Sequence, residues 1–388
     1  MKFLHVTTFY PPYHFGGDAV YVQRLAELLA SSGHEVDVVH SLDAYRLMGG
    51  AVRSNPESAR VHVHQLSSAT PRLSALVTHQ LGHPLPYRSQ LTSIFQKNYD
   101  VIHFHNISLL GPAILGYGRA RKVYTTHEHW LICPMHVLWQ FQRQVCQKPT
   151  CLRCVLQARR PPQWWRYTPW LKQCCRHIDL FLAPSESTAR RHQAEGIEQN
   201  FRVLPLFAPE PQPGPVQLQL QRPYFLYVGR LERLKGLHTL IPHMEPLDAD
   251  LVVAGDGPQE PELRRLAAAN PRIHFLGWQS SQQLAGLYPQ ARAVVVPSLT
   301  YETFGTVILE AFSYATPVLA SHLAAQAGAI QQSGGGFVYH NSSELTQQLA
   351  ALSADPQQAR LLGARGYEAY RKLWTPQQHL KQYLSLVS

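Results

Sequence analysis

The sequence predicts two consecutive α/β domains, each built on a parallel sheet. Short apolar segments of strand length alternate with segments of helical periodicity along the 388 residues. This alternation favours parallel sheets that are covered by helices on both faces. A chain of this length is too long for one ordinary hydrophobic core and suits two domains. A proline-rich stretch without periodicity, residues 209–222 (PEPQPGPVQLQLQR), separates the two series and is typical of an interdomain linker.

The first predicted domain, residues 1–208, opens with a strand, a turn-rich loop and a helix. Phe3–Thr7 is the strand, the loop reads FYPPYHFGG, and Asp18 is expected to cap the helix. Gly33 is expected to end this helix. The further strands predicted in this domain are His34–His40, Arg60–Leu66, Val101–His105, Lys122–Thr126 and Ile178–Ala183.

The second predicted domain, residues 223–373, repeats this construction without a repeated sequence. A helix over Pro356–Leu373 is expected to begin with Asp355 as its cap and a proline in its first turn, and another helix is predicted over Pro258–Ala269. The predicted strands are Tyr224–Val228, Asp250–Ala254, Arg272–Leu276, Ala293–Pro297, Pro317–Ala320 and Phe337–Tyr339.

The net charge and the distribution of apolar residues indicate which partners and which location to expect. The net charge of +10 indicates a partner that carries phosphate, whether nucleotide, nucleic acid or anionic lipid. No window approaches the run of about 18 apolar residues that a membrane helix needs. The N-terminus MKFLHVTTFYPP lacks the apolar region of a signal peptide, so a cytoplasmic protein is expected.

Two motifs in the second domain follow predicted strands. Gly229-Arg230 comes directly after the first strand, with Lys235 five positions beyond Arg230. A guanidinium fork and a mobile ammonium at this spacing suit a diphosphate, although a loop of surface charges is the simpler interpretation of this motif alone. Ala254-Gly255-Asp256-Gly257-Pro258 again follows a strand and opens a helix, as ordinary turn chemistry also would.

A third motif, Pro297 to Ala311, carries two carboxylates. A loop holds Glu302, a helix is expected to begin near Phe304 to Thr306, and Glu310 lies about two turns along. The helix N-terminus would offer N–H groups and a positive dipole to a phosphate. If the segment is helical throughout, its eight steps span roughly 12 Å, comparable to a sugar, a diphosphate and a ribose. A helix with one capping and one surface glutamate is the competing interpretation.

The chain resembles the family 4 glycosyltransferases of the GT-B fold. In the second half the resemblance is carried by YVGRLERLKG, AGDGP, FLGW and the spacing of Glu302 and Glu310. In the first half it is carried by HVTTFYPPYHFGG, DVIHFHN and TTHEHWLICP. It implies two Rossmann-like domains that face each other across a cleft, with residues 374–388 as a helix that packs back on the first domain.

The resemblance also implies roles for individual residues. Glu302 would contact the transferred sugar, Arg230 and Lys235 would neutralise the diphosphate, and His127 would lie near the donor sugar. Glu310 would bind the ribose. The other residues expected to bind the donor are Gly16, Gly17, Gly229, Gly277, Phe304, Gly305, Thr306 and Val307.

The implied reaction is retaining transfer of a hexose-type sugar from a nucleotide diphosphate-sugar to a saccharide or lipid-linked acceptor. The leaving diphosphate would be stabilised by preorganised positive charge, so no cofactor is required for catalysis. An epimerase or a phosphorylase on the same fold is the alternative enzyme. A non-catalytic module that binds membrane or nucleic acid is the alternative outside enzymes.

All six cysteines lie within residues 130–175, an expected insertion, and four of them form a motif. Cys133, Cys146, Cys151 and Cys154 form C-x12-C-x4-C-x2-C, which suits a structural zinc ion, whereas free thiols in a loop are the other interpretation.

The stretch RRPPQWWRYTPWLKQCCR (159–176) interleaves tryptophans with basic residues. This pattern suits peripheral contact with an anionic membrane, expected at the inner face of the plasma membrane. Trp164, Trp165 and Trp170 packed into the first domain are the favoured alternative. Nucleic acid is not expected as a partner, because no nucleic-acid-binding motif accompanies the charge.

Overall fold

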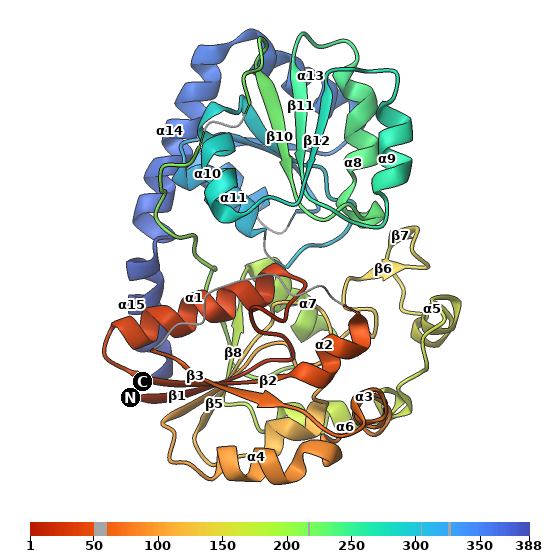
Figure 1. Cartoon of the computed structure of the whole chain (residues 1–388), viewed down its shortest axis with the longest axis vertical. Helices are drawn as coiled ribbons and strands as arrows, with labels where there is room; N and C mark the ends of the chain where they lie inside the picture. Colours follow the sequence, from red (N-terminus) through yellow and green to blue (C-terminus); the bar gives the residue numbers. More distant parts are fainter. Residues whose placement is uncertain (50–59, 216–217, 304, 325–326) are drawn as a thin grey trace. The chain divides into compact units, whose positions relative to one another are not determined.

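The computed structural model describes residues 1–49, 60–215, 218–303, 305–324 and 327–388. These residues divide into two units, each of which is an α/β body (Figure 1). The first unit comprises Met1–Val137, Thr150–Pro205 and Leu380–Ser388. The second comprises Leu138–Pro149 and Leu206–His379.

The first unit is built on a seven-stranded sheet in the order β3-β2-β1-β4-β5-β8-β9. Every neighbouring pair in it is parallel. The strands are β1 (Lys2–Val6), β2 (Glu35–Ser41), β3 (His62–Leu66), β4 (Val101–Phe104), β5 (Arg121–Thr125), β8 (Leu180–Ala183) and β9 (Phe201–Val203). The central strands β1, β4 and β8 are almost wholly buried, as a sheet covered on both faces requires.

Helices and single turns of 3-10 helix connect these strands. The helices are α1 (Gly17–Ser31), α2 (Leu42–Met48), α3 (Pro71–Leu81), α4 (Arg88–Phe95), α5 (Cys151–Gln157), α6 (Trp170–Cys175) and α7 (Glu186–Ala194). The 3-10 turns are η1 (Leu85–Tyr87), η2 (Pro112–Gly116) and η3 (Trp164–Tyr167). Trp165 is buried in the core of this unit and Trp170 packs against it, whereas Trp164 is 62% exposed.

The second unit is built on a six-stranded parallel sheet in the order β12-β11-β10-β13-β14-β15. Its strands are β10 (Tyr224–Val228), β11 (Asp250–Ala254), β12 (Ile273–Gly277), β13 (Ala293–Val296), β14 (Val318–Ser321) and β15 (Gly336–Tyr339). A short antiparallel hairpin, β6 (Trp139–Gln140) with β7 (Gln144–Val145), is grouped with this unit.

The helices of the second unit cover this sheet (Figure 1). They are α8 (Leu237–Leu240), α9 (Glu260–Ala267), α10 (Ser281–Leu287), α11 (Thr306–Ser313), α12 (Ala327–Ser333), α13 (Ser342–Ala354) and α14 (Pro356–Leu373), with 3-10 turns η4 (Arg233–Lys235), η5 (Ile241–Met244) and η6 (Tyr288–Gln290). The last helix, α15 (Pro376–Val387), ends in residues grouped with the first unit, where Arg121 donates hydrogen bonds to the carbonyls of Leu386 and Ser388.

The structure confirms most of the predicted elements and corrects a few. Helix α14 has the predicted bounds, and Asp355 accepts hydrogen bonds from the backbone N–H groups of Gln357 and Gln358. Asp18 is not the cap of α1, because the helix already begins at Gly17 and Gly16 holds the capping position. The sequence does not predict strand β9, because its three residues show no clear apolar pattern. They form a strand through pairing with β8.

Candidate active site

The order of the strands places one end of β10 at a topological switch point. Strand β10 lies between β11 and β13, so the chain runs outward in opposite directions on its two sides. Loops at the carboxyl ends of the strands diverge at such a point, and open α/β sheets bind ligands there. The loops after β10 and β13 carry the motifs that the sequence singled out.

Glycines let three strand-end loops of this sheet meet backbone to backbone. Gly229 donates a hydrogen bond to the Ala254 carbonyl, and Gly255 donates one to the Gly277 carbonyl at 2.7 Å. A Cβ at Gly255 would lie 1.9 Å from the carbonyl oxygen of Gly229, so no side chain fits. Gly277 adopts φ +68°, which favours glycine. The predicted Gly229 and Gly277 therefore lie in one layer of loops.

Lys235 and Glu302 meet at the switch point. Lys235 ends η4 after β10, and Glu302 lies in the loop after β13; Nζ and Oε1 are 2.6 Å apart. Ser298 donates a second hydrogen bond to the same carboxylate oxygen at 2.7 Å. The Glu302 side chain is only 9% exposed, whereas that of Lys235 is 34% exposed. The ammonium therefore sits between a buried carboxylate and the surface of the unit.

The charge state of Glu302 follows from these contacts. Burial alone would raise the pKa of this carboxyl. The Lys235 ammonium and the hydrogen bonds from Lys235 and Ser298 outweigh burial and hold the pKa below its usual value. Glu302 is therefore an anion at neutral pH and serves as an acceptor of hydrogen bonds.

Arg230 lies in the same loop but does not join this pair. Its guanidinium forms an ion pair with Glu232 at 2.7 Å and is 53% exposed. The backbone carbonyl of Arg230 accepts a hydrogen bond from the Tyr227 hydroxyl at 2.8 Å, which anchors the loop to β10. A surface arginine held on a fixed backbone can exchange its carboxylate partner for a phosphate.

Helix α11 begins close to Glu302 in the chain. Gly305 holds the capping position, and Thr306 and Val307 are the first residues of the helix, so their N–H groups belong to its N-terminus. The predicted Phe304 lies outside the described residues. A continuous helix from Glu302 to Glu310 is wrong, because the helix starts only at Thr306.

Glu310 lies on the second turn of α11. Its Oε2 accepts a hydrogen bond from the Tyr288 hydroxyl at 3.0 Å. Tyr288 is buried and belongs to η6, so it fixes the carboxylate from a neighbouring element.

The first unit has its own switch point, between β1 and β4. Gly16 and Gly17 end the loop after β1 and begin α1. In that first turn Asp18 accepts a hydrogen bond from the Asn106 side chain at 3.1 Å, and Asn106 follows β4. The backbone N–H of Thr8 donates to the Asn106 carbonyl. The loops after β1 and β4 are thus held together, with Gly16 and Gly17 beside them.

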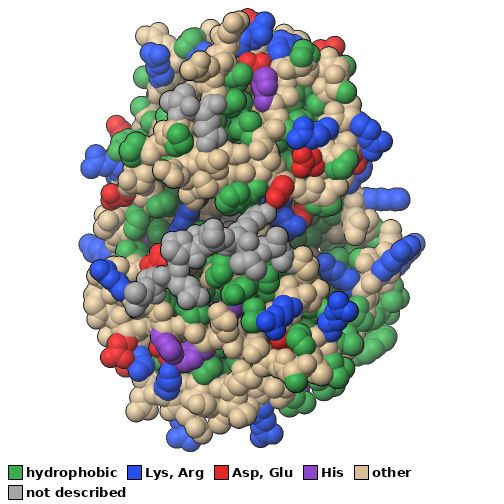
Figure 2. All heavy atoms as spheres, in the orientation of Figure 1, with side chains coloured by type: hydrophobic (Ala, Val, Ile, Leu, Met, Phe, Trp, Pro, Cys, Tyr) green, Lys and Arg blue, Asp and Glu red, His purple; other side chains and the backbone are tan. Residues whose placement is uncertain are grey.

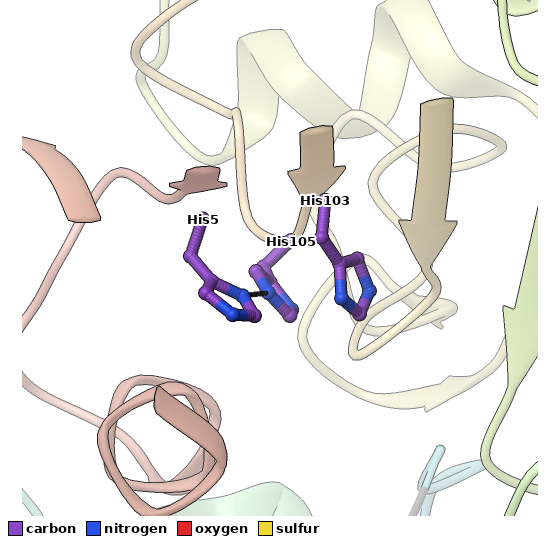
Figure 3. A group of neighbouring side chains, drawn as sticks. All are labelled: His5, His103 and His105. Atoms are coloured by element: carbon purple, nitrogen blue, oxygen red, sulfur yellow. Dashed lines mark hydrogen bonds between the residues drawn. The ribbon is translucent and has the colours of Figure 1, made fainter. Parts of the chain in front are cut away.

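His127 follows β5, is half-buried, and hydrogen-bonds to a group of buried histidines. Its Nε2 lies 2.9 Å from Nδ1 of His105. Figure 3 shows the next contact, in which Nε2 of His105 lies 2.9 Å from Nδ1 of His5. His103 lies beside them, bonded through Nδ1 to the Tyr383 hydroxyl and through Nε2 to the Thr125 hydroxyl.

Burial keeps these rings uncharged. It lowers the pKa of His5 to about 3 and that of His127 to about 4, the latter against the opposing attraction of Asp18. The pKa of His105 is also far below its usual value, because of burial and the neighbouring histidines. The group therefore offers neutral donors and acceptors at physiological pH.

The strand register brings these histidines together, which the sequence pattern did not reveal. His5 and His103 are paired in the register of β1 and β4 and lie on the same face. Histidines two positions apart on one strand share a face, and 103 and 105 have this spacing. His5 and Tyr383 receive no role from the sequence, because their contacts with His105 and His103 join residues 100 and 280 positions apart.

The four cysteines of the motif do not all lie on one element. Cys133 and Cys154 are buried, and Cys151 and Cys154 are one turn apart on α5. Cys146 follows β7 in the segment that is grouped with the second unit. Glu128, next to His127, accepts a hydrogen bond from Nδ1 of His136 at 2.6 Å.

Comparisons with known proteins find relatives for both halves of the chain. The family description "Glycosyltransferase Family 4" matches residues 15–208, and "Glycosyl transferases group 1" matches residues 222–355. An uncharacterized glycosyltransferase of Methanocaldococcus jannaschii is 27% identical over 358 residues, which cover 83% of this chain and 80% of the relative. A D-inositol 3-phosphate glycosyltransferase of Arthrobacter is 28% identical over 379 residues, which cover 88% of this chain and 82% of the relative.

Solved structures share the fold. Sucrose-phosphate synthase from Thermosynechococcus elongatus superposes with a TM-score of 0.76 at 22% identity, covering 100% of this chain and 98% of that chain. The Anabaena protein HepE, solved with UDP and glucose, gives a TM-score of 0.69 at 18% identity, covering 100% of this chain and 99% of that chain.

The protein is a glycosyltransferase with the GT-B type of fold. More particularly, the chain belongs to glycosyltransferase family 4. Among the described residues, none of the helices combines the length and the apolar character that crossing a membrane requires.

Acid should destabilise the folded chain below about pH 6.5, the pKa of an ordinary histidine. In the folded chain His5 titrates near 3 and His127 near 4, so the unfolded chain binds more protons between these values and 6.5. The stabilisation is complete above pH 6.5 and is lost as pH falls, by up to about 1.4 kcal/mol per pH unit for each such group. Urea unfolding at pH 7.5 and 5.0 measures it.

The His5→Phe variant should reduce the proton uptake on unfolding by about one at pH 5.0. The exposed His62, on β3, supplies a control in His62→Phe, which should leave the pH dependence as it is in the wild type. Equal stability of the wild type at the two pH values would show that the histidines are not held neutral.

Proposed function

We propose that the protein is a retaining glycosyltransferase that moves a hexose-type sugar from a nucleotide diphosphate-sugar to a saccharide or lipid-linked acceptor. The observation that carries this proposal is the pairing of Lys235 with the buried Glu302 at the switch point of the second unit. A cation and an anion with fixed geometry suit a ligand that has phosphates at one end and hydroxyls at the other.

In this proposal the loop cations receive the diphosphate. Lys235 exchanges part of its contact with Glu302 for a phosphate oxygen, and Arg230 does the same with Glu232. The N–H groups of Gly305, Thr306 and Val307 lie at the N-terminus of α11, where the helix dipole also stabilises the negative charge of the diphosphate. Glu302, kept ionised by its environment, accepts hydrogen bonds from sugar hydroxyls, and Glu310 accepts them from the ribose.

The proposed reaction breaks the bond between the anomeric carbon and the phosphate oxygen, and its electron pair leaves with the diphosphate. The acceptor oxygen forms the new bond on the same face of the sugar and passes its proton to the leaving phosphate. Preorganised cations stabilise the charge that develops, which is the electrostatic form of catalysis. Support for the donor class comes from structural neighbours solved with UDP, with UDP and glucose, or with UDP-2-fluoro glucose.

Substitution of the two glutamates should distinguish contacts with the sugar from contacts with the nucleotide. In Glu310→Gln, the affinity for both UDP and the intact UDP-sugar should fall, because the ribose contact is common to both. In Glu302→Gln, the affinity for UDP should stay close to that of the wild type while transfer falls by about 100-fold or more, as the loss of a preorganised polar contact does. Calorimetric titration and a nucleotide-release assay over UDP-, GDP- and ADP-sugars measure these effects.

Lys235→Ala should lower both donor affinity and kcat, and Lys372→Ala, which removes an exposed lysine of α14, provides the matched control. Turnover that rearranges the donor sugar without an acceptor would contradict the proposed transfer. Full activity of Lys235→Ala would remove the role given to the diphosphate contact.

We also propose that Cys133, Cys151 and Cys154, with Cys146, hold a structural zinc ion. Support comes from the helical spacing of Cys151 and Cys154, from the burial of two of the thiols, and from Arg166. Arg166 is half-buried, and burial lowers the pKa of its guanidinium to about 10, while attraction to Cys133 and Cys151 opposes this shift. Thiolates near a guanidinium are favoured in the ionised form that zinc requires.

Metal analysis of the purified protein should find one zinc ion per chain. The variant Cys154→Ser should lose it together with thermal stability, whereas Cys174→Ser, at a buried cysteine outside the motif, should keep it. A wild-type protein without stoichiometric zinc after expression in zinc-supplemented medium would disprove this site.

The first unit carries a surface that we propose contacts an anionic lipid bilayer. It is formed by α3, α5 and η3, and its exposed apolar side chains are Leu73, Leu76, Leu81, Leu152, Leu156, Trp164 and Tyr167. Trp165 donates a hydrogen bond to the His79 carbonyl, which joins η3 to α3. Arg153, Arg159 and Arg160 are exposed close by in the chain, and Figure 2 shows hydrophobic and basic side chains side by side on the right-hand edge of this unit.

Such a surface should bind vesicles in a charge-dependent way, since its rings and leucines insert while its cations meet lipid phosphates. The protein should float with vesicles that contain phosphatidylglycerol and stay in solution with pure phosphatidylcholine. Trp164→Ser combined with Leu156→Ser should abolish flotation. Leu361→Ser, at a residue of α14 with similar exposure (61%), is the control. Equal flotation of the double variant would contradict this surface.

A further inference from the structure

The two oxygens of the Glu302 carboxylate have different surroundings in the second unit. Oε1 accepts two hydrogen bonds, one from the Lys235 ammonium at 2.6 Å and one from the Ser298 hydroxyl at 2.7 Å. Among the residues that the structure describes, Oε2 receives neither a hydrogen bond nor an ion pair. One oxygen therefore holds the side chain in place, and the other is left to accept a hydrogen bond from a ligand.

Oε2 faces the start of helix α11. A Cβ at Gly305, the residue that caps this helix, would lie 3.4 Å from Oε2 and 3.5 Å from Cδ1 of Ile308. Gly305 has the extended backbone conformation (φ −98°, ψ 94°), which other residues adopt as readily, so the backbone does not require a glycine. The missing side chain leaves the space beside Oε2 open.

A backbone contact joins the two loops that supply the donors of Oε1. The N–H group of Leu299 donates a hydrogen bond to the Leu234 carbonyl at 2.9 Å. These residues directly neighbour Ser298 and Lys235 in the chain. The loops after β10 and β13 thus present the ammonium and the hydroxyl to Oε1 as one assembly.

The two donors differ in how far they can move. The Lys235 side chain is long and partly exposed, and in the proposed function it turns part of its contact to a phosphate oxygen. Ser298 is buried, and its short side chain comes from the second residue after the end of β13. A hydroxyl group has one proton to donate, and Ser298 donates it to Glu302. Ser298 can therefore hold the carboxylate while the ammonium moves toward the diphosphate.

We propose that Ser298 is a positioning residue that holds Glu302 by Oε1, so that Oε2 accepts a hydrogen bond from a hydroxyl group of the transferred sugar. This inference rests on the proposed function for the contact of Glu302 with that sugar. An ionised carboxylate only accepts hydrogen bonds. The site accordingly favours a sugar that carries a hydroxyl group at this position and disfavours one that is deoxygenated or acidic there.

Loss of the Ser298 hydroxyl should affect transfer and leave nucleotide binding as it is. In Ser298→Ala, kcat in the nucleotide-release assay should fall about tenfold, because a hydrogen bond to a charged group contributes about 1.5 kcal/mol. The affinity for the free nucleotide, measured by calorimetric titration, should stay at the wild-type value. Ser298→Cys has nearly the same shape but only a weak donor and should resemble Ser298→Ala, whereas Ser298→Thr keeps the hydroxyl and should restore kcat.

Ser313→Ala is the matched control. Ser313 is a similarly buried serine of the same unit, and its hydroxyl donates to a backbone carbonyl, that of Glu310. This variant should keep the wild-type kcat. Equal losses of kcat in Ser298→Ala and Ser313→Ala would overturn the inference. Wild-type kcat in Ser298→Cys would also overturn it, because the shape of the side chain and not its hydrogen bond would then be what matters.

Carbon-13 NMR of the Glu302 carboxyl group, assigned by its loss in Glu302→Gln, tests the positioning without turnover. In the wild type the pKa of Glu302 should lie below its usual value, because Lys235 and Ser298 outweigh burial. In Ser298→Ala it should rise by about one pH unit, which corresponds to a tenfold change in the equilibrium, and in Ser313→Ala it should not. Tyr227 also lies close to Glu302 but stays neutral over this range, since burial and Glu302 raise its pKa.

The NMR titration separates this inference from the proposed function. An unchanged pKa of Glu302 in Ser298→Ala would overturn the hold of Ser298 on the carboxylate. Absence of turnover with every nucleotide-sugar, combined with the expected rise of the pKa, would refute the proposed function and leave Ser298 as the residue that holds Glu302.

Gly305→Ala tests the oxygen that is assigned to the sugar. The substitution adds a methyl group beside Oε2 and keeps both the backbone N–H and the extended conformation. The kcat should fall, while the pKa of Glu302 stays at the wild-type value because both hydrogen bonds to Oε1 remain. Wild-type kcat in Gly305→Ala would overturn the assignment of Oε2 to the sugar.

Discussion

The structure depends on the constraint that all the strands of each main sheet run parallel. Parallel strands place every carboxyl end at the same edge, and a chain that winds outward in two directions leaves one point where neighbouring loops separate. In the first unit this point lies between β1 and β4, and in the second between β10 and β13. Residues that are distant in the sequence, such as Lys235 and Glu302, meet there because the loops that carry them leave the sheet at the same edge.

The buried polar groups at the two switch points differ in their charge state. In the second unit a buried carboxylate is kept charged, since an ammonium and a hydroxyl compensate the cost of removing it from water. In the first unit His5, His105 and His127 hydrogen-bond to one another, and burial keeps their rings neutral. A charged site suits phosphates, whereas a neutral one suits hydroxyl groups.

Glycines support the candidate site of the second unit. The contact of Gly255 with the Gly229 carbonyl lets the loops after β10 and β11 lie in one layer. Gly236, at φ +75°, ends η4 directly after Lys235, where a Cβ would lie 1.8 Å from the carbonyl oxygen of Pro297. Backbone packing thus fixes the chain next to Lys235, and the contact with Glu302 directs its ammonium.

The amino-acid sequence by itself determined the elements and the class of site. The alternation of apolar segments predicted nearly every strand, Asp355 predicted the start of α14, and the loops after strands identified Lys235 and Glu302. These signals are local, because periodicity and capping depend on residues within a few turns of one another. Tertiary structure alone decided that Arg230 pairs with Glu232, that α11 begins four residues after Glu302, and that His5, His105 and His127 form a chain. Those outcomes depend on strand register and on burial, and neither can be inferred from a single stretch of sequence.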